Sequence, residues 1–299
     1  MTIARLPLDR YALCTLLLVC SLGLTACEDI ITLDLKTTEP QVVIEASIYE
    51  YGSATVSITR TTDFYRPNLV ESVSGAQIII SDNYGRTDTL KGSSSVGQYA
   101  DFTYRVRGTP GRTYHVMVLV EGHQYEATSS MPAGLNLDSL TTEYQPGGGI
   151  GAEQDAGYRV HVFFRDNPGI HDYGRVKLWR DGVYYYTSIY LYDGKFSDGN
   201  PVDYNYFFDV FKGGSYIDVQ LISMEKSLYD YFSTLSEVII SEDPSNFLDA
   251  SPANPTTNWS GGALGYFGAF AVSHGQIVLP DSTTGIAGRG SGDRSGLAR

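Results

Sequence analysis

The chain has 299 residues, with 34 acidic against 21 basic side chains, and its formal net charge is −13. A chain this acidic lacks the clustered Lys and Arg that hold phosphate backbones, so we expect no nucleic-acid partner and no electrostatic binding to anionic lipid. The 23 tyrosines and 32 glycines favour twisted β-sheets over helices.

The first 26 residues have the organisation of a bacterial lipoprotein signal peptide. A short basic start is followed by an apolar run over residues 11–25, which is too short to span a hydrocarbon core of about 30 Å. Leu-Thr-Ala then precedes Cys27, the arrangement of a lipobox. We therefore predict cleavage between Ala26 and Cys27, and acylation of the Cys27 thiol, into which labelled palmitate should enter. A lipid at this position would anchor the mature chain to the outer membrane.

Residues 27–40 are predicted to be a lipid-anchored linker. Glu28 and Asp29 directly follow the acylated cysteine. Acidic residues at this place resemble the surface-export signals of some Gram-negative lipoproteins, or they simply begin a solvated linker. The other two cysteines leave with the signal peptide, so the mature chain can form no disulfide and depends on its apolar cores.

Residues 41–134 are predicted to form an all-β sandwich. Short segments with alternating apolar and polar side chains recur about every ten residues and are separated by turn residues, a pattern typical of a sandwich. The seven expected strands cover residues 41–51, 54–62, 75–81, 86–90, 97–106, 113–120 and 124–129.

Residues 135–279 are predicted to form a second β-rich domain that carries one amphipathic helix. The expected strands cover residues 135–144, 158–164, 175–179, 183–192, 204–211, 216–222 and 264–272. Between the last two, residues 224–239 place apolar side chains at helical spacing, so we expect a helix that covers a sheet face or edge. These side chains are Leu228, Phe232, Leu235 and Ile239. Residues 280–299, rich in Gly, Ser and Thr, are predicted to form a flexible tail.

Short motifs at both ends of the mature chain carry a family resemblance. They are Val42–Ala46, Ser74–Ile80, Gly97–Tyr99, Gly111–Tyr114, Asn254-Pro255, Asn258-Trp259 and Gly265–Ala269. In this order they resemble the domain of unknown function 4249 (DUF4249) family of outer-membrane lipoproteins. The N-terminal part also resembles transthyretin-like or carboxypeptidase-regulatory-like sandwiches. The resemblance implies a role beside TonB-dependent outer-membrane transporters, and it supplies no catalytic residue.

The side-chain inventory gives little support for catalysis, a metal or a cofactor. The sequence has no Gly-x-Ser-x-Gly elbow and no His-Glu-x-x-His helix, and its five histidines are scattered, so we predict that the chain is not an enzyme. The loop Gly147–Ala152 loosely fits a dinucleotide fingerprint but lacks the following helix, which favours a flexible loop. Four aspartates could ligate calcium or simply be solvated loop carboxylates. These are Asp193, Asp198, Asp203 and Asp209.

Tyrosine-rich runs are the most suggestive binding feature. Aromatic faces stack on sugar rings or peptide side chains, and the phenol adds a polar group. The alternative is a tyrosine-rich sheet surface that is packed by the helix. The candidate ligand-binding side chains are Tyr185, Tyr190, Tyr192, Tyr204 and Tyr206. Trp179 and Trp259 are expected to be core or interdomain anchors rather than ligand platforms.

The sequence thus predicts a surface-exposed outer-membrane lipoprotein without catalytic activity. Its expected role is that of an accessory or substrate-capturing partner of a TonB-dependent β-barrel transporter, with a glycan or a peptide as ligand. One alternative is a structural or adhesin-type surface lipoprotein, which would need only sandwiches and a lipid. A glycan-acting enzyme is the other alternative, and it would show acidic or histidine groups clustered in a cleft.

Overall fold

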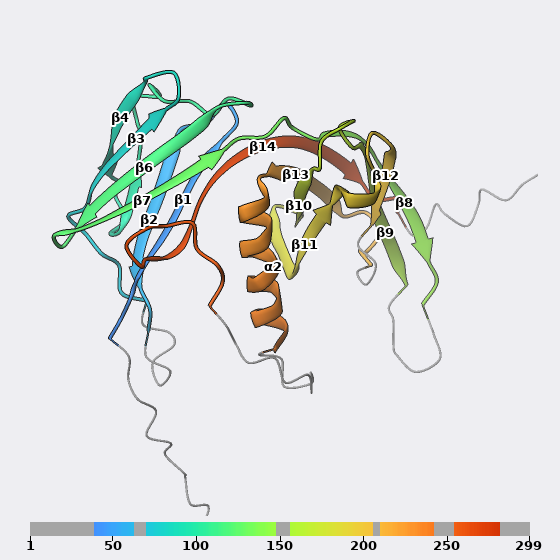
Figure 1. Cartoon of the computed structure of the whole chain (residues 1–299). Coiled ribbons are helices and arrows are strands. Elements are labelled where there is room, and N and C mark those ends of the chain that lie inside the picture. The colour runs from blue at the N-terminus through green and yellow to red at the C-terminus, as the bar shows by residue number, and fades with distance from the viewer. Residues whose placement is uncertain (1–38, 63–69, 148–155, 206–209, 242–253, 282–299) are drawn as a thin grey trace, which may run out of the picture. The chain divides into compact units, whose positions relative to one another are not determined.

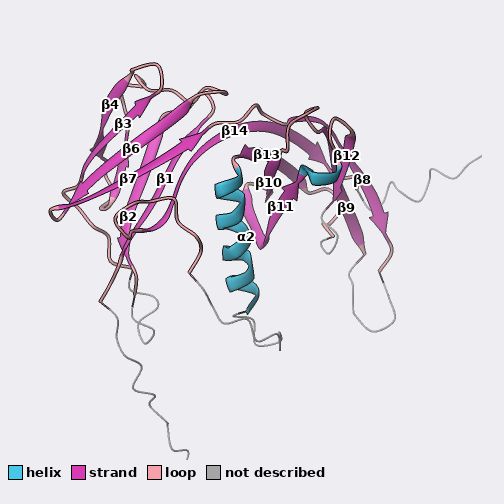
Figure 2. Ribbon diagram, in the orientation of Figure 1, coloured by secondary structure: helices cyan, strands magenta, loops and turns pink. Residues whose placement is uncertain are grey.

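The protein is mainly β, as predicted, and this is seen in a computed structural model that describes residues 39–62, 70–147, 156–205, 210–241 and 254–281 (Figure 2). The predicted signal peptide, nearly all of the linker and nearly all of the tail lie outside these residues. The described residues from Pro40 onward belong to one compact unit.

In the described part of the chain, fourteen strands make two sheets (Figure 1). The first seven are β1 (Val42–Tyr49), β2 (Ala54–Arg60), β3 (Gln77–Asp82), β4 (Thr87–Gly92), β5 (Gln98–Ala100), β6 (Thr113–Val120) and β7 (His123–Ser130). The others are β8 (Asn136–Gln145), β9 (Gly157–Arg165), β10 (Tyr173–Arg180), β11 (Val183–Asp193), β12 (Pro201–Asn205), β13 (Tyr216–Met224) and β14 (Leu264–Val278). An eleven-stranded sheet has the order β11-β10-β13-β14-β1-β2-β5-β4-β3-β6-β7, and a three-stranded sheet has the order β12-β9-β8.

The first core lies inside the N-terminal half of the large sheet. Alternate side chains of β1, β2, β3 and β6 are buried there, as the period of two predicts. The sheet curves so that β14 meets β7, its edge strand. There the backbone N–H of Ala269 in β14 donates to the Ser129 hydroxyl of β7 over 3.0 Å. Trp259 is buried in the same core, and its indole N–H donates to the Ile44 carbonyl oxygen over 2.9 Å. This half of the chain is therefore a β-sandwich-like structure to which the far end of the chain contributes.

Strand β14 joins the two ends of the sequence. It runs parallel to β1, from the pair Val43 and Leu264 onward, and then continues as the antiparallel partner of β13. Gly265 makes the close approach feasible, because its φ is +90° and a Cβ at this position would lie 2.3 Å from the Ile44 carbonyl oxygen. The strand expected over residues 264–272 is therefore longer than predicted, since pairing with β13 extends it to Val278.

The strand predicted over residues 97–106 is wrong beyond Ala100. Strand β5 ends there because the Asp101 carboxylate accepts hydrogen bonds from the backbone N–H groups of Thr103 (2.7 Å) and Tyr104 (3.0 Å). This side-chain turn competes with a strand, and Tyr104 takes a left-handed φ of +56°.

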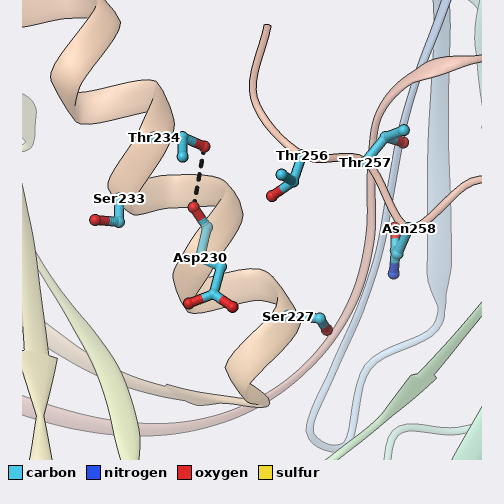
Figure 3. Close-up of a pocket in the computed structure, with 7 residues that line it drawn as sticks. All are labelled: Ser227, Asp230, Ser233, Thr234, Thr256, Thr257 and Asn258. Carbon is cyan, nitrogen blue, oxygen red and sulfur yellow. Dashed lines mark hydrogen bonds between the residues drawn. The ribbon is translucent and has the colours of Figure 1, made fainter. Parts of the chain in front are cut away.

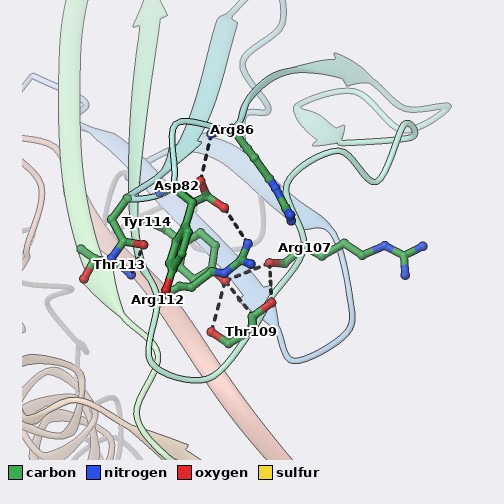
Figure 4. Close-up of polar contacts among 9 residues, drawn as sticks. Asp82, Arg86, Arg107, Thr109, Arg112, Thr113 and Tyr114 are labelled. Atoms are coloured by element: carbon green, nitrogen blue, oxygen red, sulfur yellow. Dashed lines mark hydrogen bonds and ion pairs between the residues drawn. The ribbon is translucent and has the colours of Figure 1, made fainter.

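A polar network closes one end of the sandwich (Figure 4). The Tyr114 hydroxyl accepts a hydrogen bond from the Thr109 backbone N–H (2.7 Å) and donates to the Arg107 carbonyl oxygen (2.9 Å). Arg112 pairs with the buried Asp82 carboxylate over 2.8 Å. Because the polar groups of Tyr114 and Asp82 are satisfied within the fold, we assign this network to stability rather than to ligand binding.

The second core lies between the three-stranded sheet and strands β10, β11 and β13. The helix predicted over residues 224–239 is confirmed as α2, Lys226–Ser241. It packs against the opposite face of the large sheet, where Leu228 and Phe232 are buried. Ile239, which the sequence placed on the apolar side of the helix, is 49% exposed because it lies in the last turn, beyond this packing.

Candidate functional site

The aromatic side chains between α2 and the sheet form a packed cluster. The Tyr266 ring of β14 lies 5.0 Å from the Tyr231 ring and 5.1 Å from the Phe232 ring of α2. Burial raises the pKa of Tyr231 to about 12 and raises that of Tyr266 as well. The phenols in this layer are therefore neutral at physiological pH. Glu45 of β1 pairs with Tyr266 in the sheet register, and burial raises the pKa of its carboxyl group.

A cavity of about 500 Å³ lies between α2 and the segment that leads into β14 (Figure 3). It is lined by Ser227, Asp230, Ser233, Thr234, Thr256, Thr257 and Asn258. The segment beside the helix is held firmly, because the Asn258 amide donates to the Phe267 carbonyl oxygen (2.8 Å) and accepts from its N–H (2.9 Å). The Thr257 hydroxyl accepts from the Trp259 backbone N–H over 3.1 Å. One wall of the cavity is thus anchored to the first core.

The chemistry of this cavity suits a polar ligand. Five hydroxyl groups line it, and each can donate and accept hydrogen bonds. The Thr234 hydroxyl is used by the helix itself, because it donates to the carbonyl oxygens of Asp230 (3.0 Å) and Tyr231 (2.9 Å). The Asp230 carboxylate accepts from Lys226 over 2.6 Å. Neither His nor Cys is among the seven lining side chains, so the wall offers hydrogen bonding rather than a nucleophile with its base.

The predicted tyrosine site lies elsewhere, around the second core. Tyr185, Tyr190 and Tyr204 pack against this core, and the Tyr185 ring lies 5.1 Å from the Phe211 ring. Tyr192 is 6% exposed. The structure therefore brings these four tyrosines into one region around the second core, with Tyr204 on β12 of the three-stranded sheet and the other three on β11. Tyr206 lies outside the described residues. A ligand-binding role for these tyrosines stays a prediction.

The aspartates of the proposed calcium loop have partners within the protein. In the described part of the chain, no group of three or more His, Cys, Asp or Glu side chains is placed to hold a metal ion. Asp209 lies outside that part. The other three contact the His171 ring (Asp193, 2.5 Å), the Gly169 backbone N–H (Asp198, 2.6 Å) and the His161 ring (Asp203, 2.9 Å).

Two buried carboxylates near this loop were not singled out by the sequence. Asp166 is 1% exposed and accepts a hydrogen bond from the Tyr192 hydroxyl over 2.8 Å. Asp172 is 4% exposed and accepts from the Asn167 backbone N–H over 2.8 Å. Burial raises the pKa of Asp172, and the neighbouring Asp166 carboxylate adds to the effect. Because this shift opposes ionisation of Asp172 in the folded state, we expect the stability of the fold to depend on pH through Asp172.

Comparisons with known proteins agree with the resemblance that the sequence motifs indicated. Among the described residues, no helix has the length and apolar character that crossing a bilayer requires. A search of curated proteins finds no match. The family described as "Domain of unknown function (DUF4249)" matches residues 28–276, which is most of the chain and includes every described strand except the last residues of β14. The chain therefore belongs to the DUF4249 family.

Proposed function

We propose that this protein is a surface-exposed outer-membrane lipoprotein that captures a substrate for a TonB-dependent transporter and carries out no catalysis. The observation that carries the proposal is the lipobox that ends at Cys27, one residue before the family match begins. An acyl chain contributes about 0.8 kcal/mol of membrane affinity per buried methylene, so lipid at Cys27 would hold an acidic chain at a bilayer that its charge does not favour.

The cavity beside α2 supports the substrate-capturing part of the proposal. It offers hydroxyl groups, an amide and one carboxylate, and its wall is preorganised by the hydrogen bonds of Asn258. Preorganised polar groups lower the ordering cost of binding a small polar ligand. In the same proposal, the N-terminal sandwich is of the transthyretin-like type, and it would present the cavity-bearing half at a distance from the membrane.

Metabolic labelling with palmitate tests the anchor. We expect the wild-type chain and Cys20→Ala to incorporate label, because Cys20 lies within the leader. Cys27→Ala should incorporate none and should remain uncleaved or become soluble. Label that still enters Cys27→Ala would refute the lipoprotein assignment. A separate experiment, protease shaving of intact cells, tests whether the wild-type chain faces outward.

Native purification tests the partnership. A β-barrel transporter should co-purify with the lipoprotein in stoichiometric amounts from detergent-solubilised outer membranes. If the labelled lipoprotein is surface-exposed but purifies without a barrel, the transporter role is wrong and the adhesin or structural alternative gains support.

A further inference from the structure

A cluster of cationic and aromatic side chains lies on the face of β10 that α2 partly covers. Arg175 is the centre of the cluster. Its guanidinium lies 4.8 Å from the Phe232 ring centroid of α2, and its Nη2 donates to the Tyr184 hydroxyl over 3.2 Å. The Tyr184 ring in turn lies 5.2 Å from the Trp179 ring. Lys177 stands between Arg175 and Trp179 on the same face, because alternate residues of a strand point the same way.

The two cations of this cluster are not neutralised by an ion pair among the described residues. In the described part of the chain, neither Arg175 nor Lys177 forms an ion pair, and the buried Arg175 Nε–H has no hydrogen-bond partner. Lys177 is half-buried, and this burial together with the nearby Arg175 lowers its pKa to about 8. Leaving two half-buried cations unpaired in a chain of net charge −13 is costly for the apo fold, and a bound anion would remove that cost.

The backbone beside Lys177 is also interrupted. Strand β11 pairs Tyr190 with Val176 and Tyr185 with Leu178, so residues 186–189 bulge out opposite Lys177. Such a bulge ends the regular pairing locally and re-aims side chains, and bulges are common next to binding sites. It interrupts the β10–β11 ladder opposite Lys177, while on the other side Lys177 stays paired with Gln220 of β13.

The neighbouring strands add polar groups that complement sugar hydroxyls. Across the sheet, Lys177 is in register with Gln220 of β13, which is in register with His274 of β14. Two residues further along β10, Trp179 is in register with Asp218 of β13. The Asp218 carboxylate accepts a hydrogen bond from the Gln276 side-chain amide over 3.2 Å. The other Asp218 oxygen is buried and has no partner among the described residues.

We propose that this face of β10 binds an anionic saccharide of the uronic-acid class. The sugar carboxylate lies against Lys177 and the Arg175 guanidinium, and a sugar ring stacks on the Trp179 and Tyr184 aromatic pair. Hydroxyl groups of the sugar donate to the Asp218 carboxylate and exchange hydrogen bonds with Gln220. A carboxylate, a ring and hydroxyls in one molecule match the three kinds of group found here, whereas a bare anion would use only the cations.

This site goes beyond the proposed transport role, because binding by the purified protein depends neither on the anchor nor on a barrel partner. Tryptophan fluorescence first tests the electrostatics, since Trp259 is 5% exposed and quenching by ions therefore reports Trp179. The ratio of iodide quenching to caesium quenching should be at least twofold higher for the full-length lipoprotein in non-ionic detergent than for free N-acetyltryptophanamide. Lys177→Gln should remove most of this preference, and Lys91→Gln on the exposed side of β4 should leave it unchanged. A preference that is absent, or equal in the two variants, would overturn the cationic site.

Calorimetric titration then tests the ligand class with trigalacturonate, a glucuronate-containing trisaccharide and the neutral maltotriose at equal ionic strength. We expect at least one acidic trisaccharide to bind at least tenfold more tightly than maltotriose. Lys177→Gln should weaken that binding about tenfold, and Lys91→Gln should have no effect. Absence of binding by both acidic trisaccharides overturns the proposal, as does equal binding of maltotriose. Inorganic phosphate that competes as well as the acidic sugars would show a simple anion site and would also overturn it.

Discussion

Removing the Tyr192 hydroxyl should destabilise the fold by about 1.5–3 kcal/mol, the usual cost of losing a hydrogen bond to a charged group. The hydroxyl donates to Asp166, whose carboxylate is 1% exposed and therefore cannot recruit bulk water in its place. The change Tyr192→Phe keeps the ring, which packs edge-on against Phe164 with centroids 4.9 Å apart, so cavity formation contributes little. The weak remaining bond from the Gly199 N–H, at 3.3 Å, does not replace the lost donor.

Urea denaturation followed by circular dichroism measures this effect. The matched control is Tyr144→Phe on β8, because that side chain is 53% exposed and loss of its hydroxyl should cost less than about 0.5 kcal/mol. The Tyr192→Phe effect should shrink in an Asp166→Asn background, where the acceptor is no longer charged. Equal midpoints for Tyr192→Phe and the control would refute the reasoning, and Tyr192 would then be available for the ligand role that the sequence suggested.

Three further substitutions follow from backbone geometry and titration, each measured by urea denaturation. Gly265→Ala should lower the free energy of unfolding by at least about 3 kcal/mol, because the new Cβ would meet the Ile44 carbonyl oxygen. Gly262→Ala is the control. Its φ is +83° and the space around it is open, so the free energy of unfolding should fall by only about 1–2 kcal/mol. Because burial raises the pKa of Asp172 in the folded state, Asp172→Asn should be more stable than wild type at pH 7. The difference should vanish below the ordinary pKa of 3.8, where the Asp172 carboxyl is protonated in both the folded and the unfolded state. Burial lowers the pKa of Lys177 from 10.5 to about 8, so Lys177→Met should be more stable than wild type at pH 7 by about 1 kcal/mol or more. This difference in stability should fade as the pH rises from 8 toward 10.5, where Lys177 is neutral in the folded state. Equal effects of the two alanine variants, or differences that do not change with pH, would contradict these expectations.

Local strand content could be predicted from the sequence, but strand pairing could not. Alternation of apolar side chains located nearly every strand, since burial of one face imposes a period of two whatever the partner is. It failed after Ala100, where the Asp101 side chain bonds to the backbone and ends β5. The parallel pairing of β1 with β14 joins residues more than 200 positions apart, and no local signal encodes it.

The site was harder to predict than the fold. The cavity beside α2 combines helix residues with Thr256–Asn258, and nothing in either segment alone indicates the other. The cationic cluster did leave a signal, because Arg175, Lys177 and Trp179 alternate with the apolar Val176 and Leu178. That alternation places two cations and an aromatic on one face. Only the structure shows that neither cation forms an ion pair among the described residues.

The shared strand β14 makes a prediction about folding that the sequence pattern alone would not make. The sequence placed a boundary between residues 134 and 135, yet β14 pairs with β1 through Phe270 and with β13 from Ala271 onward. The two ladders are formed by consecutive halves of one continuous strand, and loss of either ladder leaves half of that strand unpaired, so we expect the described unit to unfold in a single transition. Trp259 lies in the first core and Trp179 on β10 of the other half, so Trp179→Phe and Trp259→Phe each leave one reporter. In each variant the fluorescence and circular dichroism midpoints in urea should coincide. Two resolved transitions, with each tryptophan following a different one, would show that the cores unfold independently despite the strand that links them.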